Sequence, residues 1–394
     1  MQLSELLELN GLARQDARSY PRRRWLAEKL EGEKGKHFIG IVGPRGAGKT
    51  ILLRQDLLRR DDAIYLSLDT FEEDDLFDWV KRLHQDHGYT RFLLDEVHFI
   101  PHFEAALKKI YDFLDVEVLF TSSVALAMQR TARRVRLLEL RHFGLREYVH
   151  FQHDRLLPRL SLVDIRDRRW TRQHLECAPL FERFVQGRCL TFALEEPDPL
   201  PGLKSILDKI LVHDVPRVAR LTHEEIDRIS KMLRFIGRSS VDGIHYSSIS
   251  RNIGITKYKA EAYVKLLQQA FVLHAVYPKG ANVMRQAKVL MAVPFRLLYR
   301  DWDQAVGGLR EDFFADAMRS AGLDFHYLKT TRGSKTPDYL LRAEDGSELV
   351  AEIGGQGKGR SQFKGYRAEQ KLIFSSRQAA DGMHRPLFLL GFTS

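Results

Sequence analysis

The sequence predicts an α/β protein with a parallel sheet that carries helices on both faces, followed by a helical region with a winged helix and a small second α/β domain. Residues 37–151 alternate short apolar runs with amphipathic stretches, which is typical of a parallel sheet. Residues 175–273 are mostly helical in pattern, and strand-like runs return after about residue 308. A chain of 394 residues also exceeds one ordinary core, so we expect several domains.

Composition indicates a folded, soluble chain, with 44% hydrophobic and 29% charged residues. The longest apolar runs, Phe38–Val42 and Pro386–Leu390, fall far short of the roughly 20 residues that cross a bilayer. We therefore expect no membrane segment. The first ten residues carry acids where an export signal carries bases, and Cys177 and Cys189 lack metal-site spacing. Both observations favour a cytoplasmic location.

The net charge is +10, from 62 Lys and Arg against 52 Asp and Glu. Basic residues cluster at Arg22–Arg24, Arg130–Arg136 and Arg166–Arg169. Contact with DNA explains such an excess, and so do solvated helix faces together with arginines that meet nucleotide phosphates. The composition leaves both interpretations open.

Each strand of the predicted sheet is a short apolar run, followed by an amphipathic stretch. The expected strands are His37–Val42, Ala63–Leu68, Arg91–Leu94 and Glu117–Phe120, and the expected helices are the segment after Thr50, Asp74–His84 and Phe103–Leu114. This order places successive strands side by side with their carboxyl ends at one edge.

A glycine-rich turn follows the first predicted strand. It comprises Gly43, Pro44, Arg45, Gly46, Ala47, Gly48, Lys49 and Thr50, with Ile51 next, and matches G-x-x-x-x-G-K-[ST]. Its glycines let backbone N–H groups turn toward phosphate oxygens, at the positive end of the next helix. We expect Lys49 to reach the outer phosphates and the Thr50 hydroxyl to ligate Mg²⁺. The flanking strand and helix favour a P-loop that binds ATP or ADP over a plain turn.

Two acids, Asp95 and Glu96, end the third predicted strand. At this position Asp95 is placed to hold the metal, and Glu96 to polarise the attacking water as general base. The pair follows the P-loop by one helical crossover, as expected for a Walker B motif. We therefore predict hydrolysis of ATP and not only binding.

The fourth strand ends in Thr121, Ser122 and Ser123. A small polar residue here is placed to orient the lytic water, and we choose Ser122, with its two neighbours close behind. The alternative is that Ser122 caps the helix predicted at Val124–Met128.

Together these residues resemble the AAA+ ATPases. The chain is further similar to a prokaryotic group in which the ATPase precedes a winged helix and a restriction-endonuclease-like domain, with Phe143, Glu147 and Tyr148 matching that group's signature. The resemblance implies a homo-oligomer in which a neighbouring subunit supplies an arginine to the γ-phosphate. Arg133 and Arg134 lie in a suitable region, and spacing does not choose between them.

The middle of the chain has the order of a winged helix. The expected elements are helices at Glu225–Arg238, Tyr246–Ile253 and Lys257–Ala270, then extended Phe271–Tyr277 and a turn at Pro278–Gly280. This order presents its third helix to a DNA groove, and Lys257, Lys259 and Lys265 lie on that helix. An equally weighted alternative is a packing module whose lysines keep it soluble.

The last part resembles the PD-(D/E)-x-K nuclease core, with expected strands at Phe325–Lys329, Asp338–Arg342, Glu348–Ile353 and Pro386–Phe392. The resemblance makes Asp338 and Glu352 ligands of a second metal and Glu311 the third acid. Gly354 stands at the lysine position, which favours a domain that does not cleave. Lys358, in a glycine-rich run, is a candidate contact to a phosphate backbone.

These patterns divide the chain into five expected parts: an extension at 1–36, the ATPase core at 37–151, a helical linker at 152–222, the winged helix at 223–292 and the endonuclease-like domain at 293–394. Three functions remain open. The first is an ATP-driven machine whose later domains bind nucleic acid or a protein partner. The others are an ATP-regulated nuclease and a nucleotide-timed DNA-binding regulator.

Overall fold

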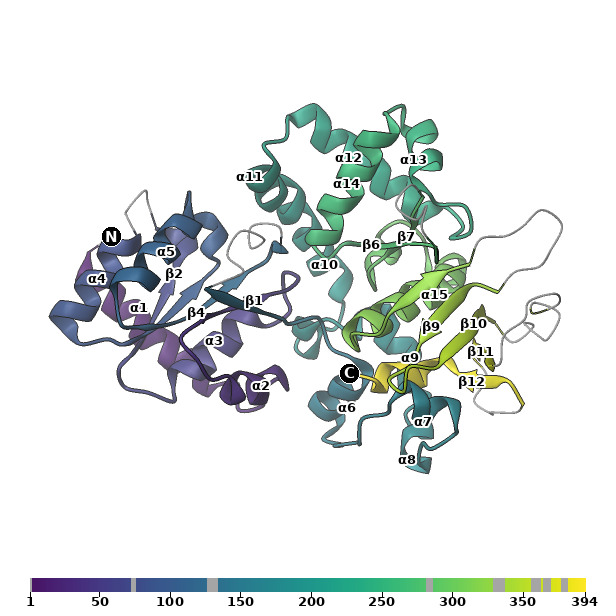
Figure 1. Cartoon of the computed structure of the whole chain (residues 1–394), viewed down its shortest axis with the longest axis horizontal. Coiled ribbons are helices and arrows are strands. Elements are labelled where there is room, and N and C mark those ends of the chain that lie inside the picture. The colour runs from purple at the N-terminus through teal and green to yellow at the C-terminus, as the bar shows by residue number, and fades with distance from the viewer. Residues whose placement is uncertain are drawn as a thin grey trace. The chain divides into compact units, whose positions relative to one another are not determined.

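The computed structural model describes residues 2–71, 76–125, 134–280, 286–328, 337–355, 363, 370–376 and 382–394. The chain forms two compact units, Met1–His142 and Phe143–Ser394 (Figure 1). Two of the candidate residues, Arg133 and Lys358, lie outside the described residues.

A five-stranded, all-parallel sheet with strand order β2-β3-β4-β1-β5 forms the centre of the first unit. Its elements are α1 (Leu3–Arg18), α2 (Leu26–Gly32), β1 (Phe38–Val42), α3 (Lys49–Leu57), β2 (Ala63–Ser67), α4 (Leu76–His87), β3 (Arg91–Asp95), α5 (Phe103–Phe113), β4 (Glu117–Ser122) and β5 (Val135–Glu139). In this order β4 lies between β1 and β3. The ends of these three strands therefore bring the P-loop, the Walker B acids and the polar tip of β4 to one edge.

Helices cover both faces of the sheet, as predicted (Figure 1). One face packs against α1, α2 and α3, with Ile41, Leu93 and Leu119 in a shared apolar core. Strand residues alternate between faces, so Phe38 points the other way and meets Tyr111 of α5 edge to face, at 5.3 Å between ring centroids.

The N-terminal extension belongs to this unit. Asn10 Oδ1 accepts a hydrogen bond of 2.9 Å from the backbone N–H of Tyr65 on β2. The Arg14 guanidinium donates to the carbonyls of Leu57, Arg60 and Ala63, at 2.9 to 3.0 Å. These bonds fix α1 across the end of α3 and the start of β2.

The second unit begins with helices and ends with a mixed sheet. Its elements are α6 (Leu145–His153), α7 (Leu162–Arg166), α8 (Arg172–Leu175), α9 (Leu180–Arg183), α10 (Pro199–Lys209), α11 (Val215–Ala219), α12 (His223–Arg238), α13 (Tyr246–Ile253), α14 (Lys257–Gln269), β6 (Leu273–Val276), β7 (Lys288–Met291), α15 (Trp302–Ser320), β8 (Phe325–Tyr327), β9 (Tyr339–Arg342), β10 (Glu348–Gly354), β11 (Gln370–Ser375) and β12 (His384–Pro386). The three helices predicted for the middle region are present, and β6 and β7 form an antiparallel pair after them.

The last sheet has strand order β12-β11-β10-β9-β8. One prediction for this region was wrong in detail. Residues Leu387–Phe392 form a 3-10 helix instead of a strand, because this wholly buried apolar run packs on all sides and its pattern alone does not separate helix from strand. The strand β11, which pairs in parallel with β10, was not predicted.

Hydrogen bonds join the β6–β7 hairpin to α15. The N–H of Met291 donates to Asp312 at 3.0 Å, and that of Val293 donates to Asp316 at 2.7 Å. Asp312 also receives two bonds from the Arg296 guanidinium, at 2.5 and 3.0 Å, in a pair that is almost fully buried. The expected border at 292/293 therefore falls inside one hydrogen-bonded assembly.

None of the described helices has the length and apolar character that crossing a bilayer demands.

Candidate nucleotide site

The P-loop connects β1 to α3 through backbone conformations that favour glycine. Gly46 and Gly48 have φ of 74° and 86°, in the left-handed region. Gly43 is needed for a different reason, because a Cβ there would lie 1.9 Å from the carbonyl oxygen of Leu140, just after β5. The loop is thus shaped both by its own turns and by the chain that passes beside it.

Lys49, the first residue of α3, is buried with its side chain turned back into the loop. Its Nζ donates to the carbonyl oxygens of Gly43 and Pro44, at 2.9 and 3.0 Å. The same ammonium lies 4.0 Å from Oε1 of Glu96. Lys49 therefore stands between the loop and the Walker B acids, where a phosphate chain would need a positive charge.

Asp95 lies at the end of β3, with only 3% of its surface exposed. Its Oδ1 accepts a hydrogen bond from the hydroxyl of Thr121, and its Oδ2 one from the phenol of Tyr65 at 2.8 Å. Burial and the neighbouring Glu96 raise the pKa of Asp95 above its ordinary value, against hydrogen bonds from Thr121, Tyr65 and Thr50 that favour the carboxylate. A buried carboxylate beside the Thr50 hydroxyl is a donor set that suits Mg²⁺.

Glu96 has a left-handed backbone, φ 55° and ψ 51°, at the turn that ends β3. Its Oε2 accepts a hydrogen bond of 3.1 Å from the backbone N–H of Ser123 and lies 3.2 Å from Nδ1 of His98. Its other oxygen faces Lys49, as described above. The Glu96 carboxylate is therefore held from two sides, by Ser123 and His98 on one side and Lys49 on the other.

The hydroxyl that contacts the acids is that of Thr121 and not that of Ser122. Thr121 Oγ1 donates to Asp95 and accepts from the backbone N–H of Glu96 at 2.8 Å. Ser122 instead bonds its own turn, donating to the carbonyl of Val124 at 3.0 Å and accepting from its N–H at 3.2 Å. Alternation along β4 explains the difference, because adjacent side chains point to opposite faces.

Three residues near the site carry no motif signal: Tyr65, His98 and Arg24. The buried Arg24 donates to the carbonyl of Ala47 in the P-loop at 2.5 Å and to that of Arg141 at 2.8 Å. It thus braces the P-loop against the segment that follows β5. In the sequence, Arg24 appears only as part of the basic cluster Arg22–Arg24, and composition alone did not assign a role to that cluster.

Arg134 does not lie beside the P-loop within this chain. It precedes β5, at the amino end of a sheet whose carboxyl end carries the P-loop. Its guanidinium pairs with Asp112 at 3.1 Å and lies over the ring of Tyr111. Any contact of Arg134 with nucleotide would have to be made across subunits, as the resemblance implies.

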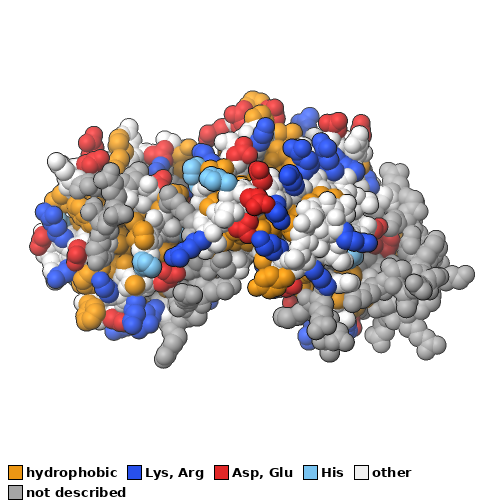
Figure 2. Space-filling view, turned by 90° about the horizontal axis from the view of Figure 1, so that it is seen from above, with side chains coloured by type: hydrophobic (Ala, Val, Ile, Leu, Met, Phe, Trp, Pro, Cys, Tyr) orange, Lys and Arg blue, Asp and Glu red, His pale blue; other side chains and the backbone are white. Residues whose placement is uncertain are grey.

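The three candidate lysines of α14 do not share one surface. By the helical period, Lys257 and Lys265 lie on one face and Lys259 on another. Lys259 pairs with Glu225 of α12 at 3.3 Å, and Lys265 pairs with Glu261 at 2.7 Å. On the face shown in Figure 2, basic side chains are interspersed with acidic and apolar ones.

The three acids of the C-terminal region come near one another, with a lysine among them. Glu311 accepts bonds of 2.6 Å from both Tyr339 and Lys288. Burial, together with Glu311 and Glu352, raises the pKa of Asp338 to about 7. Across the described ranges, however, no three His, Cys, Asp or Glu side chains are grouped so as to hold a metal ion.

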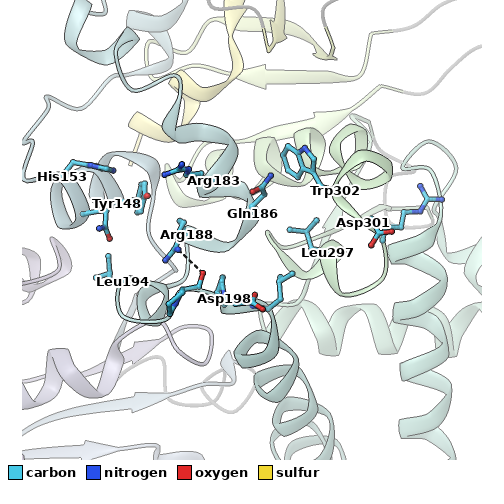
Figure 3. Close-up of a pocket in the computed structure, with 15 residues that line it drawn as sticks. Tyr148, His153, Arg183, Gln186, Arg188, Leu194, Asp198, Leu297, Asp301 and Trp302 are labelled. Atoms are coloured by element: carbon cyan, nitrogen blue, oxygen red, sulfur yellow. Dashed lines mark hydrogen bonds between the residues drawn. The ribbon is translucent and has the colours of Figure 1, made fainter.

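A cavity of about 710 Å³ lies within the second unit, apart from both acid sites (Figure 3). Its lining includes Tyr148, Arg183 and Trp302. Arg188 in its wall is engaged by backbone carbonyls, at 3.1 Å from Glu196 and 3.0 Å from Pro197. No residue of the P-loop or the Walker B turn lines this cavity, so it is not part of the nucleotide site.

Two sequence families match parts of the chain. Residues 35–149 match the family described as AAA domain. Residues 193–298 match a domain of unknown function, DUF8612. The first match covers β1 to β5 and the start of α6, and so includes every P-loop and Walker B residue.

One relative and two solved structures are similar over most of the chain. Uncharacterized protein MJ1637 of Methanocaldococcus jannaschii is 23% identical over 366 residues, covering 82% of this chain and 76% of that protein. The Walker-type ATPase PABY2304 of Pyrococcus abyssi covers 71% of this chain and 95% of its own, with 14% identity and a TM-score of 0.42. The match to the Holliday junction branch migration motor RuvB of Thermotoga maritima covers 70% of this chain and 90% of that chain, with 15% identity and a TM-score of 0.26.

At these TM-scores the two structures add no argument to the geometry. The first unit of this chain has an all-parallel sheet with a P-loop and paired acids at the end of β3, and its residues 35–149 match the AAA domain family.

Proposed function

We propose that this protein hydrolyses ATP with Mg²⁺ and uses the nucleotide state to control a second unit that binds nucleic acid or a protein partner. The observation that carries the ATPase part is the convergence of Lys49, Asp95 and Glu96 at one edge of the sheet. A P-loop alone supports binding, whereas a carboxylate held toward the phosphate site supports hydrolysis.

In this proposal the Lys49 ammonium exchanges its two carbonyl partners for phosphate oxygens when ATP binds. Glu96 accepts the proton of the attacking water. Its carboxylate is held in place by the Ser123 N–H and lies beside His98. Thr50 and Asp95 would hold Mg²⁺, which supplies charge neutralisation at the phosphates. The Thr121 hydroxyl holds the carboxylate of Asp95 and the backbone N–H of Glu96.

The proposed coupling is supported by the segment that leaves β5. The Leu140 N–H donates to the carbonyl of Val42 at 2.8 Å, and the Leu140 carbonyl lies against Gly43. Arg24 contacts both the P-loop and the carbonyl of Arg141. The chain enters the second unit at Phe143, two residues later. A change in the P-loop on nucleotide binding would therefore act directly on this connection.

Two variants test the ATPase site. Lys49→Ala is expected to lose ATP binding, because the loop loses the charge that faces the phosphates. Glu96→Gln is expected to bind ATP as the wild type does but to turn it over at least about 100-fold more slowly, since general bases contribute about 10² to 10⁴ in rate. Wild-type turnover by Glu96→Gln would show that Glu96 is not the base.

Amide hydrogen exchange tests the coupling separately. We expect ATP to change exchange in Leu140–Tyr148 of Glu96→Gln, with Lys49→Ala as the control that does not respond. ATP binding without any such change would reject the coupling while leaving the ATPase intact.

The nature of the partner can be tested on α14. If a DNA duplex is bound, Lys257→Glu with Lys265→Glu is expected to weaken binding and its salt dependence. Lys259→Glu, on the other face and paired with Glu225, is the matched control. Equal binding by all three proteins would favour a protein partner over DNA at this helix.

A further inference from the structure

The acidic cluster of the C-terminal region, defined by Glu311, Asp338 and Glu352, contains its own cation. Lys288 Nζ lies 2.6 Å from Oε2 of Glu311, with 7% of the lysine side chain exposed. The same ammonium lies 5.1 Å from the ring centroid of Tyr339, within the range of a cation–π contact. Lys288 thus forms an ion pair with Glu311 of the cluster and also lies over the ring of Tyr339, whose hydroxyl donates to Glu311.

Lys288 reaches the cluster from outside the nuclease-like sequence pattern. It is the first residue of β7, in the hairpin that the sequence assigns to the preceding domain. The hairpin is held to α15 by the bond from Met291 to Asp312. Because Glu311 precedes Asp312 on the same helix, this bond holds the strand that carries Lys288 beside the helix that carries Glu311.

The electrostatics of the cluster require a positive charge. Burial disfavours the ammonium of Lys288, but Glu311, Asp338 and Asp242 outweigh it and raise the pKa of Lys288 above its ordinary value. Glu352 is also buried, at 1% exposure. Glu311 and Glu352 both act electrostatically on Asp338, and buried carboxylates that interact in this way repel one another unless a cation lies among them.

A divalent metal does not fit the cluster as it stands. Oε2 of Glu311 already accepts from both Tyr339 and Lys288, and Oδ2 of Asp338 accepts from the N–H of Ile353 at 2.8 Å. Among the described residues, no three His, Cys, Asp or Glu side chains are grouped here so as to hold a metal ion. The chain also has Gly354 where the nuclease pattern has lysine.

We infer that the Lys288 ammonium is the resident counter-ion of Glu311 and Asp338 and stands in for the divalent metal that the nuclease resemblance implies. The cluster then serves to join the β6–β7 hairpin to α15 and the last sheet. In this inference the cluster does not depend on a metal to be stable.

Calorimetric titration of the nucleotide-free full chain with Mn²⁺ tests this inference. We expect no Mn²⁺ site in the wild type that is sensitive to Asp338→Asn. Lys288→Ala is expected to gain such a site, with affinity at least ten-fold above the wild type, and to lose it when Asp338→Asn is added. Lys279→Ala, which removes an exposed lysine 2.6 Å from Glu348, is the matched control and should gain nothing.

Two results would overturn the inference. One is a wild-type Mn²⁺ site that disappears in Asp338→Asn, and the other is Lys288→Ala that folds but gains no site. If Lys288→Ala does not fold, thermal unfolding of Lys288→Met is compared with that of Lys288→Met combined with Glu311→Gln. Recovery of the melting temperature in the double variant supports the counter-ion role, and its absence contradicts that role.

Discussion

The phenol of Tyr65 donates a hydrogen bond of 2.8 Å to Oδ2 of Asp95, so the second strand of the sheet directly supports the acid proposed to hold Mg²⁺ on the third. Burial raises the pKa of Asp95, and this bond opposes the rise because it favours the charged carboxylate. A residue outside every motif thus helps to keep Asp95 ionised.

We predict that Tyr65→Phe makes hydrolysis require more Mg²⁺. Loss of this hydrogen bond raises the pKa of Asp95 further. Activity is expected to increase with pH as Asp95 ionises, so in Tyr65→Phe this increase should occur at a higher pH than in the wild type. A charge-assisted bond of this kind is worth about 1.5–3 kcal/mol. Initial rates across a Mg²⁺ series at several pH values measure both effects, and identical curves would exclude the role of Tyr65.

Substitutions at the tip of β4 should separate its two hydroxyl residues. Thr121→Val removes the bonds to Asp95 and Glu96 while keeping a side chain of similar shape, and should lower the turnover rate about ten-fold or more, since each bond is worth about 1 kcal/mol or more. Ser122→Ala removes bonds within its own turn and a contact of 3.4 Å with Nδ1 of His98, but none to Asp95 or Glu96, and should cost less. A larger loss for Ser122→Ala in steady-state assays would restore it as the residue that orients water.

We predict that Arg24→Met weakens ATP binding without abolishing hydrolysis. The substitution keeps the buried stem but removes the bonds to Ala47 and Arg141, so the P-loop must be ordered by the nucleotide itself. Arg23→Met is the matched control, because Arg23 makes an exposed pair with Glu31. Equilibrium binding of a fluorescent ATP analogue measures the difference, and equal affinities for the two variants would contradict the prediction.

The buried pair of Arg296 and Asp312 should dominate the stability of the second unit. Arg296→Met leaves a buried carboxylate without its cation, which costs about 3–5 kcal/mol. Arg228→Met removes an exposed pair with Glu224 on α12 and should cost less than about 1 kcal/mol. Calorimetric unfolding of both variants provides the comparison, and similar melting temperatures would show that the buried pair is not structurally important.

The sequence predicted the first unit well because its signals are local. The strands at 38–42 and 91–95 are apolar runs, and the P-loop and acid pair follow them directly. Tyr65 and Arg24 could not be predicted, because each reaches the site from a segment separated from it along the chain. The sequence also did not predict that Thr121, and not Ser122, contacts Asp95, since the face to which each side chain of β4 points depends on register.

Prediction was weaker in the second unit because its parts combine across the sequence. Lys288 lies 23 residues before Glu311 and carries no motif, yet it meets the cluster that Asp338 and Glu352 suggested. The run at 387–392 is apolar throughout and has no periodicity that distinguishes strand from helix. Such features depend on tertiary packing and not on neighbouring residues.

The bond between Lys288 and Glu311 limits where this chain can be divided. A fragment that begins at residue 293 would keep all three acids but lose their ammonium, and would also lose the Met291 N–H that donates to Asp312. Exchange of the C-terminal segment between related proteins at that border would therefore transplant a cluster of like charges. A domain border placed before β6 would keep Lys288 and the three acids in the same exchanged segment.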